Sequence, residues 1–282
     1  MSLIYILVIT FALAGQNIIK KPYMDKTGGR GVYFFTATVS FFAMMFFIML
    51  SGRLEFTMSM LPYSALFALC YCVATIFNVL AVANGSVSLT SLFISYSLMI
   101  PTFYGVFFLH DALSIGFVPG IALLIVSLFL INGKAKKNGI SLKWIIQVSI
   151  AVVSNGMCAI VQKAYQMQFN DANTNEFMII ALFIVTLVMI IMIIIKEKKQ
   201  IKSYAKQGGV LGMICGIMNG IVNLLILRAS AQMSMSLLFP FISAGGIVTT
   251  YMASRFLYRE RLAKTQLLGL IAGIFAVALL NI

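Results

Sequence analysis

Carboxamide side chains recur inside long apolar stretches of this sequence. An amide offers two N–H donors and one acceptor oxygen, and leaving it without a partner in an apolar environment is costly. Asn219 and Asn223 are four residues apart, so on a helix they share one face. The amides are candidates for contacting a polar small molecule, with helix-to-helix hydrogen bonds of about 0.6 kcal/mol each as the alternative. They are Gln16, Asn17, Asn78, Asn155, Gln162, Asn219 and Asn223.

Hydroxyl groups form a second pattern with regular spacing. Serine or threonine recurs every seven residues in two places, which keeps the hydroxyls on one face of a helix. Such a face can line a water-filled path, or its hydroxyls can bond to their own helix or to a neighbouring one. The two sets are Ser88, Ser95 and Thr102, and Ser236, Ser243 and Thr250. Aromatic walls with polar tips are expected from Tyr71, Tyr96, Tyr104 and Tyr251.

The sequence lacks the arrangements typical of catalytic or metal sites. The single histidine, His110, is followed directly by Asp111, and adjacent residues do not face each other on a helix. There is no Walker A, HExxH or GxSxG motif. The four cysteines, which are Cys70, Cys72, Cys158 and Cys215, lack the spacing of zinc ligands. We therefore predict no catalytic residue, no metal and no cofactor.

The composition is that of an integral membrane protein. Hydrophobic residues make up 61% of the 282 residues and charged residues only 10%, whereas soluble domains carry about 25% charged residues. Apolar runs of about 20 residues match the length of a helix that crosses a bilayer. We predict an all-α membrane protein with ten transmembrane helices, at residues 2–19, 31–51, 61–83, 86–109, 113–132, 144–167, 177–195, 208–229, 233–257 and 265–282.

The chain contains an internal repeat. The segment SVSLTSLFIS at residues 86–95 returns as SMSLLFPFIS at residues 234–243, an offset of 148. Upstream, at an offset of 142, Lys21 and Tyr23 align with Lys163 and Tyr165. We predict a first five-helix repeat at residues 1–133, a basic linker at 134–143 and a second five-helix repeat at 144–282. Because each repeat has an odd number of spans, the second enters the membrane from the opposite side, as in many transporters.

The net charge of +13 is distributed unequally between the two faces of this ten-span arrangement. Nearly all lysines and arginines fall on one face, and Arg53, Lys163 and Arg228 are the exceptions. The positive-inside rule makes the basic face cytoplasmic and places both termini outside. We therefore expect a plasma-membrane protein whose basic residues face the cytoplasm and the lipid surface, not a nucleic-acid partner.

The closing segment resembles that of a transporter family. Residues 256–262, FLYRERL, are followed by Gly269 and Gly273 in the last span, and the first half carries the related Phe108-Leu109-His110-Asp111. Together with the five-plus-five organisation, this pattern resembles the EamA-like ten-helix members of the drug/metabolite transporter superfamily. The resemblance covers the whole chain.

The resemblance implies a carrier of small organic metabolites, commonly an exporter, with a central cavity lined by spans one, three, four, six, eight and nine. Four-helix relatives depend on a carboxylate in their first helix, where this chain has Gln16, so a neutral or zwitterionic substrate such as an amino acid is favoured over a drug cation. The alternatives are a lipid or amphiphile flippase, a drug efflux carrier, and a membrane receptor or assembly partner that moves nothing. The expected substrate-pathway residues are Gln16, Asn17, Tyr71, Asn78, Ser95, Tyr96, Asn155, Gln162, Asn219, Asn223, Ser243 and Tyr251.

Glycines at four-residue spacing mark places where helices can approach closely. Pairs of this kind occur in the fifth and tenth predicted spans, and the eighth carries Gly208, Gly212, Gly216 and Gly220. Without side chains on that face, a neighbouring helix can pack against the backbone. We expect packing within the monomer, with a homodimer through these faces as the alternative.

Overall fold

The computed structural model describes residues 2–52, 54–84, 94, 96–111, 115–132, 142–169, 173–258 and 264–279. Within these ranges the chain is helical, without strands. The α-helices are α1 (Ser2–Thr27), α2 (Val32–Leu50), α3 (Leu61–Asn84), α5 (Met99–Phe108), α6 (Phe117–Asn132), α7 (Leu142–Phe169), α8 (Thr174–Lys196), α9 (Ile201–Gln232), α10 (Met235–Tyr258) and α11 (Lys264–Leu279). Short 3-10 turns are η1 (Met58–Met60), η2 (Tyr96–Leu98) and η3 (Lys198–Gln200).

Among the described residues, six helical stretches are long and apolar enough to cross a membrane. They lie at Ile4–Met24, Val32–Leu50, Met58–Ala81, Leu142–Phe169, Thr174–Lys196 and Lys198–Gln232, and two shorter apolar stretches lie at Tyr96–Phe108 and Phe117–Ser127. An all-helical, multi-pass membrane protein is therefore confirmed.

Two of the predicted helix ends are wrong. The first helix continues from residue 19 to Thr27, and α9 begins at Ile201 instead of residue 208. Hydropathy falls at the lysines in both places, but lysine is a good helix former and does not end a helix. The first helix ends where Gly28 and Gly29 adopt positive φ values of 61° and 75°, as glycines after a helix commonly do.

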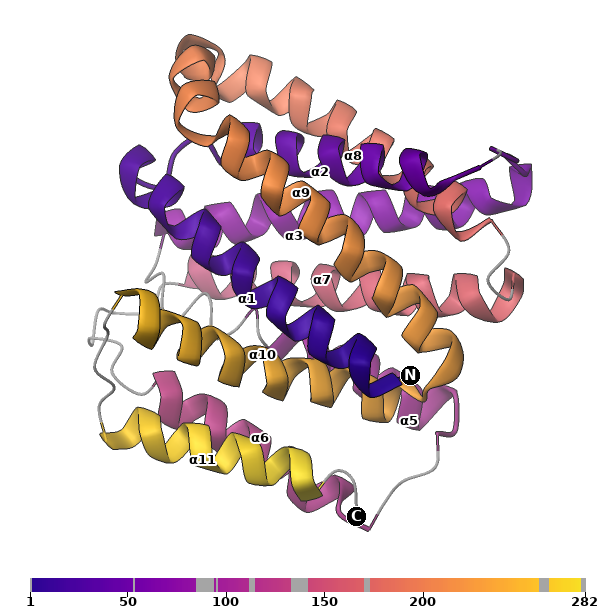
Figure 1. Ribbon diagram of the computed structural model, residues 1–282, viewed down its shortest axis with the longest axis vertical. Coiled ribbons are helices and arrows are strands. Elements are labelled where there is room, and N and C mark those ends of the chain that lie inside the picture. Colours follow the sequence, from indigo (N-terminus) through magenta and orange to yellow (C-terminus); the bar gives the residue numbers. More distant parts are fainter. Residues whose placement is uncertain are drawn as a thin grey trace.

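The helices lie roughly side by side, and α6 and α11 form a pair at one end of the molecule (Figure 1). In the first half α1 packs on α9 and α10, and in the second half α7 packs on α3 and α5. The pair α2 and α9 has its counterpart in α8 and α3. The pairs α2 with α8, α5 with α10 and α6 with α11 map onto themselves when the halves are exchanged. The packing partners of one half are thus the partners of the other.

A tyrosine at the end of α1 fixes the turn into α2. The Oη of Tyr23 donates to the carbonyl oxygen of Gly31 at 2.8 Å, and the Tyr23 ring stacks on Phe35, with centroids 4.8 Å apart. Gly31 precedes α2 and has left-handed backbone angles, φ 77° and ψ 21°. Only glycine adopts this conformation without strain, apart from occasional asparagine or aspartate.

The second half repeats this arrangement between α7 and α8. The Oη of Tyr165 donates to the carbonyl oxygen of Asn173 at 2.9 Å, and the Tyr165 ring stacks on Phe177 at 4.2 Å. Asn173 precedes α8 in the same left-handed region, φ 53° and ψ 31°. The residues correspond at the 142-residue offset found in the sequence, so the two halves share a local structure as well as packing partners.

Removing either tyrosine hydroxyl is expected to cost a similar amount of stability. Tyr23→Phe and Tyr165→Phe each delete one buried hydrogen bond and keep the stacked ring, so we expect each variant to lose about 1 kcal/mol. Thermal unfolding of the purified protein in detergent checks this. Tyr63→Phe is the control, because its partly buried ring packs beside Tyr165 without a phenolic hydrogen bond among the described contacts. A loss of stability in only one of the two variants would contradict equivalent roles for Tyr23 and Tyr165.

The glycine ladder of α9 packs against α1 and α2. A Cβ at Gly208 would lie 2.3 Å from the Tyr23 ring, and one at Gly216 would lie 2.6 Å from the Phe42 Cβ and 2.7 Å from the Val39 carbonyl oxygen. In the pair formed by α6 and α11, Ser127 Oγ donates to the carbonyl oxygen of Gly269 at 2.6 Å. These glycine faces are occupied within the chain. A homodimer stays a prediction, and it would need other faces.

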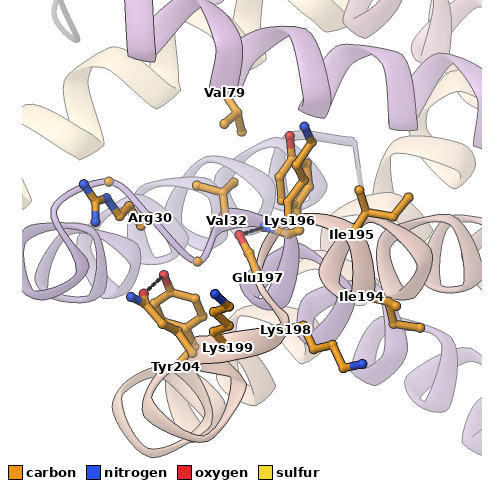
Figure 2. A pocket seen from close by; sticks show the side chains of 14 residues that line it. Arg30, Val32, Val79, Ile194, Ile195, Lys196, Glu197, Lys198, Lys199 and Tyr204 are labelled. Atoms are coloured by element: carbon orange, nitrogen blue, oxygen red, sulfur yellow. Dashed lines mark hydrogen bonds between the residues drawn. The ribbon is translucent and has the colours of Figure 1, made fainter.

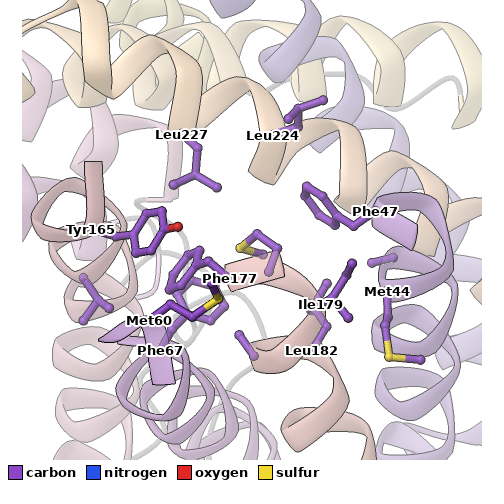
Figure 3. Close-up of a cluster of buried hydrophobic side chains, with 14 of the residues drawn as sticks. Met44, Phe47, Met60, Phe67, Tyr165, Phe177, Ile179, Leu182, Leu224 and Leu227 are labelled. Atoms are coloured by element: carbon purple, nitrogen blue, oxygen red, sulfur yellow. The ribbon is translucent and has the colours of Figure 1, made fainter. Parts of the chain in front are cut away.

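The largest buried cluster lies between α2, α3, α7, α8 and α9 (Figure 3). Phe47, Phe67, Phe177 and Tyr165 are almost completely buried in it. Aromatic side chains bury large apolar areas and favour stacked or edge-to-face contacts. This cluster joins helices from both halves and includes Leu224 and Leu227 of α9, the helix that carries two of the four amides described next.

Candidate functional site

Four carboxamides from three helices form one continuous hydrogen-bonded chain. The Nε2 of Gln162 on α7 donates to Asn223 Oδ1 on α9 at 2.9 Å. Asn223 Nδ2 donates in turn to Asn219 Oδ1 at 3.0 Å, and Asn219 Nδ2 donates to Gln16 Oε1 on α1 at 3.4 Å. Asn223 also donates to the backbone carbonyl of Asn219 at 2.9 Å. The chain therefore connects the first helix of one half to the first helix of the other through α9.

The amide chain has a direction, because every amide in it donates toward α1. Gln162 is 3% exposed and Asn223 8% exposed, so its start is buried. At its end, the Nε2 of Gln16 is buried and has no hydrogen-bond partner among the described residues. A buried N–H without a partner costs about 1–3 kcal/mol. The amide chain thus ends in an unused donor, the Gln16 Nε2–H group, which an acceptor on a bound molecule would satisfy.

A second polar contact joins α7 to η2. Asn155 Nδ2 donates to Ser97 Oγ at 2.6 Å, and Ser97 is 1% exposed. Asn155 precedes Gln162 by seven residues, or about 10 Å along the helix. Asn155 is therefore engaged at a different level of α7 from the amide chain.

The other predicted pathway residues that the structure describes lie in different surroundings. Tyr71 packs against the large buried cluster and stacks on Phe67 at 6.0 Å. The Tyr96 ring lies 6.1 Å from that of Phe129. Asn78 is partly buried on α3, and Ser243 is 6% exposed on α10. The side chains of Asn17 and Tyr251, and the whole of Ser95, lie outside the described residues.

Among the described stripe residues, Thr102 bonds to backbone, whereas the Ser236 hydroxyl donates to Ser234 Oγ at 3.2 Å. Thr102 Oγ1 donates to the carbonyl oxygen of Leu98 on its own helix at 2.9 Å. Thr249, beside the second stripe, donates to its own helix at Gly245 and to the carbonyl oxygen of Thr10 on α1 at 3.2 Å. These contacts favour a structural role for the hydroxyls of Thr102 and Thr249, which was the alternative interpretation of the pattern.

Two lysines inside the helices are further candidate groups that the sequence pattern missed. Lys20 lies on α1, four residues after Gln16, because the helix extends past the predicted end. Lys163 lies on α7, and its Nζ donates to the carbonyl oxygen of Ser230 in the last turn of α9, where helix carbonyls lack partners of their own. The i to i+4 spacing of Gln16 and Lys20 in the sequence could have identified Lys20 as a candidate.

A cavity of about 620 Å³ opens at the basic ends of α1, α2 and α8 (Figure 2). Arg30, Lys196, Lys198 and Lys199 line it, and Glu197 lies among them. The Glu197 carboxylate accepts hydrogen bonds from the backbone N–H groups at the start of α2, at 3.1 Å from Tyr33 and 2.8 Å from Phe34. A carboxylate is favoured at a helix N-terminus, so Glu197 ties α8 to α2. None of the predicted pathway residues lines this cavity.

Glu197 is expected to make folding stability depend on pH. Burial raises the pKa of its carboxyl group above the ordinary value, and the N–H donors of α2 lower it in part. A raised folded-state pKa gives a stability contribution that is fully present below the ordinary value of about 4.3 and is lost as the pH rises through the raised pKa. Glu197→Gln should remove this part of the pH dependence, as measured by thermal unfolding across the acidic range. Glu55→Gln, on an exposed carboxylate, is the control, and an unchanged slope in the Glu197 variant would contradict the assignment.

The sequence and the fold can now be compared with known proteins. The model of the EamA-like transporter family matches residues 142–282, half of the chain. The chain belongs to the EamA-like transporter family. This confirms the resemblance noted in the closing segment and makes the protein a membrane transporter of the drug/metabolite transporter type.

Solved structures share the fold. Of the 28 solved chains that match, one titled "Crystal structure of protein" has a TM-score of 0.74 at 12% identity, covering 97% of this EamA-like chain and 94% of the other. At this identity the likeness concerns the fold alone. The comparison with curated proteins gives no match. Among the described residues no group of histidine, cysteine or acidic side chains is arranged to hold a metal ion.

Proposed function

We propose that this EamA-like protein is a secondary transporter that exports small neutral or zwitterionic metabolites, such as amino acids, across the plasma membrane. The observation that carries the proposal is the amide chain from Gln162 to Gln16. Amides within a bilayer are costly unless they are paired or contact a polar ligand. Here the amides of Gln162, Asn223 and Asn219 each donate to the next amide, and Gln16 at the end has an N–H group without an acceptor.

Alternating access between inverted halves is the proposed mechanism. The exchange symmetry of the helix pairs supports an inverted ten-helix repeat, as do the matching contacts of Tyr23 and Tyr165. In transporters of this construction, one half rocks against the other around a site near the membrane midplane. The amide chain joins α1, α9 and α7, three of the helices implied to line the central cavity. Such a chain would be altered by relative movement of the halves.

The proposed orientation places the basic face in the cytoplasm and both termini outside. The start of α1 and the end of α11 lie on the same side of the molecule in Figure 1. Arg30, Lys196, Lys198 and Lys199 gather around the cavity at the ends of α1 and α8, and positive residues favour the cytoplasmic side. Labelling an amino-terminal tag from outside intact cells tests the orientation. A tag that reacts only after permeabilisation would reverse it.

Counterflow in proteoliposomes tests transport itself. A carrier exchanges labelled substrate across the bilayer, whereas a receptor binds it without exchange. The panel comprises amino acids, nucleobases, sugars, amphiphilic cations and a labelled phospholipid, the last to detect flipping. We expect exchange of an amino acid or a related compound, lost in an Asn219→Leu, Asn223→Leu variant and kept in Gln232→Leu, an exposed amide at the end of the same helix. Binding without exchange would refute transport.

A further inference from the structure

Lys20 is a basic residue inside α1 that has no carboxylate partner in the part of the chain that the structure describes. It lies within the candidate membrane span Ile4–Met24 and is only partly exposed. Among the described residues the uncharged thiol of Cys215 on α9 lies near it, and no acidic side chain pairs with it. A charge taken out of water is expensive unless it is paired. This position therefore favours an anion supplied from outside the chain.

Lys20 and the free end of the amide chain belong to the same face of the α1 and α9 interface. Gln16 and Lys20 are four residues apart on α1 and so lie on one helix face. The opposing face of α9 carries Cys215 and Asn219, also four residues apart. The Cys215 thiol approaches the carbonyl oxygen of Gln16 at 3.8 Å, and Asn219 bonds its side chain. The i to i+4 spacing therefore places the unused Gln16 N–H and the Lys20 ammonium group on one helix face.

We propose that Gln16 and Lys20 form a carboxylate-binding subsite, and that the transported compounds are small monocarboxylates, amino acids included. The inference rests on the proposed transport function and defines its substrate class by the carboxylate group, so that anionic hydroxy acids are included beside zwitterionic amino acids. A carboxylate has two acceptor oxygens, so it can take the Gln16 Nε2–H and the Lys20 ammonium group together. Among the described residues no carboxylate lies beside these donors to bind a ligand's ammonium group. The carboxylate is therefore the required group, and an α-amino group is not.

Ligand chemistry gives the first test. The purified protein is titrated with the proteinogenic L-amino acids, and each one that binds is compared with its 2-hydroxy acid and its primary amide. A hydrogen bond to a charged group contributes about 1.5–3 kcal/mol, which corresponds to an affinity loss of about tenfold or more for the amide. The hydroxy acid should bind within about threefold of the amino acid. Equal binding of the amide, or no binding by any carboxylate, would overturn the subsite.

Variants of the two residues give the second test. Lys20→Met should abolish carboxylate binding, Lys20→Arg should keep part of it, and Lys26→Met, an exposed lysine on the same helix, should leave it unchanged. Gln16→Glu places a carboxylate beside Lys20 within the chain. It should raise the melting temperature in the absence of ligand and prevent carboxylate binding. Unchanged binding in both Lys20→Met and Gln16→Glu would overturn the subsite.

The subsite and the transport function can fail separately. If counterflow detects exchange of a sugar or nucleobase that depends on Asn219 and Asn223 but not on Lys20, the transport proposal stands and the subsite is wrong. If carboxylates bind in a Lys20-dependent manner without being exchanged, the subsite stands and transport is wrong.

Discussion

Gly216→Ala is expected to destabilise the protein strongly by forcing α2 and α9 apart. The added Cβ would lie 2.6 Å from the Phe42 Cβ, 2.7 Å from the Val39 carbonyl oxygen and 3.2 Å from the Ala43 amide nitrogen. Two of these three are backbone atoms, so no change of side-chain rotamer relieves the contact. Overpacking of this kind costs about 1–3 kcal/mol and sometimes more, and the higher helix propensity of alanine offsets less than about 1 kcal/mol.

The chain provides both a matched control and a reporter for this experiment. Gly209 is on the same helix, and nothing lies within 4 Å of an added Cβ, so Gly209→Ala should be neutral or slightly stabilising. Three of the four free cysteines are buried and Cys70 is partly buried, which makes a thiol-reactive dye a sensitive probe of thermal unfolding. A Gly216→Ala protein with the same melting temperature as Gly209→Ala would show that α2 and α9 adjust their separation freely.

The sequence predicted the residues of the amide chain but not their connections. Asn219 and Asn223 could be placed on one face from their spacing alone. That Gln162 reaches Asn223, while Asn155 bonds Ser97 on η2, depends on how α7 is rotated and where it crosses its neighbours. Such geometry is set by side-chain packing over whole interfaces, including the glycine contacts of α9. Spacing within a single helix does not contain it.

The sequence pattern does not place Lys20 on the first helix, because hydropathy falls at Lys20 and Lys21 and the predicted span ends at residue 19. The helix continues because Tyr23 is fully buried and packs on Phe35, a contact between residues brought together by the turn after α1. The repeat itself was visible in the sequence, because Tyr23 and Tyr165 occupy equivalent positions. The hydrogen bonds that the two tyrosines donate to Gly31 and Asn173 are known only from the structure.

Asn223→Leu is expected to cause the largest functional loss of any single amide substitution. Asn223 accepts from Gln162 and donates to Asn219, so its removal leaves both partners without their side-chain bond. Each unsatisfied buried group costs about 1–3 kcal/mol, more than the average interhelical hydrogen bond in membranes. If substrate contacts the end of the chain, counterflow should fall by about tenfold or more, since 1.4 kcal/mol corresponds to a factor of ten.

A double-mutant cycle separates the contribution of the chain from that of each residue. Gln162→Leu alone removes the buried start of the chain but leaves Asn223 bonded to Asn219. In the double variant Gln162→Leu, Asn223→Leu the Gln162 amide is absent, so the loss of Asn223 leaves no Gln162 N–H without an acceptor. The double variant should therefore be destabilised by less than the sum of the singles, with a coupling of about 0.5–3 kcal/mol. Asn155→Leu paired with Asn223→Leu is the control, and its effects should add, because Asn155 bonds Ser97 and shares no partner with the chain. Additive losses of stability for Gln162→Leu and Asn223→Leu would mean that the two amides act independently. The amide chain from α7 to Gln16 would then contribute no coupling energy.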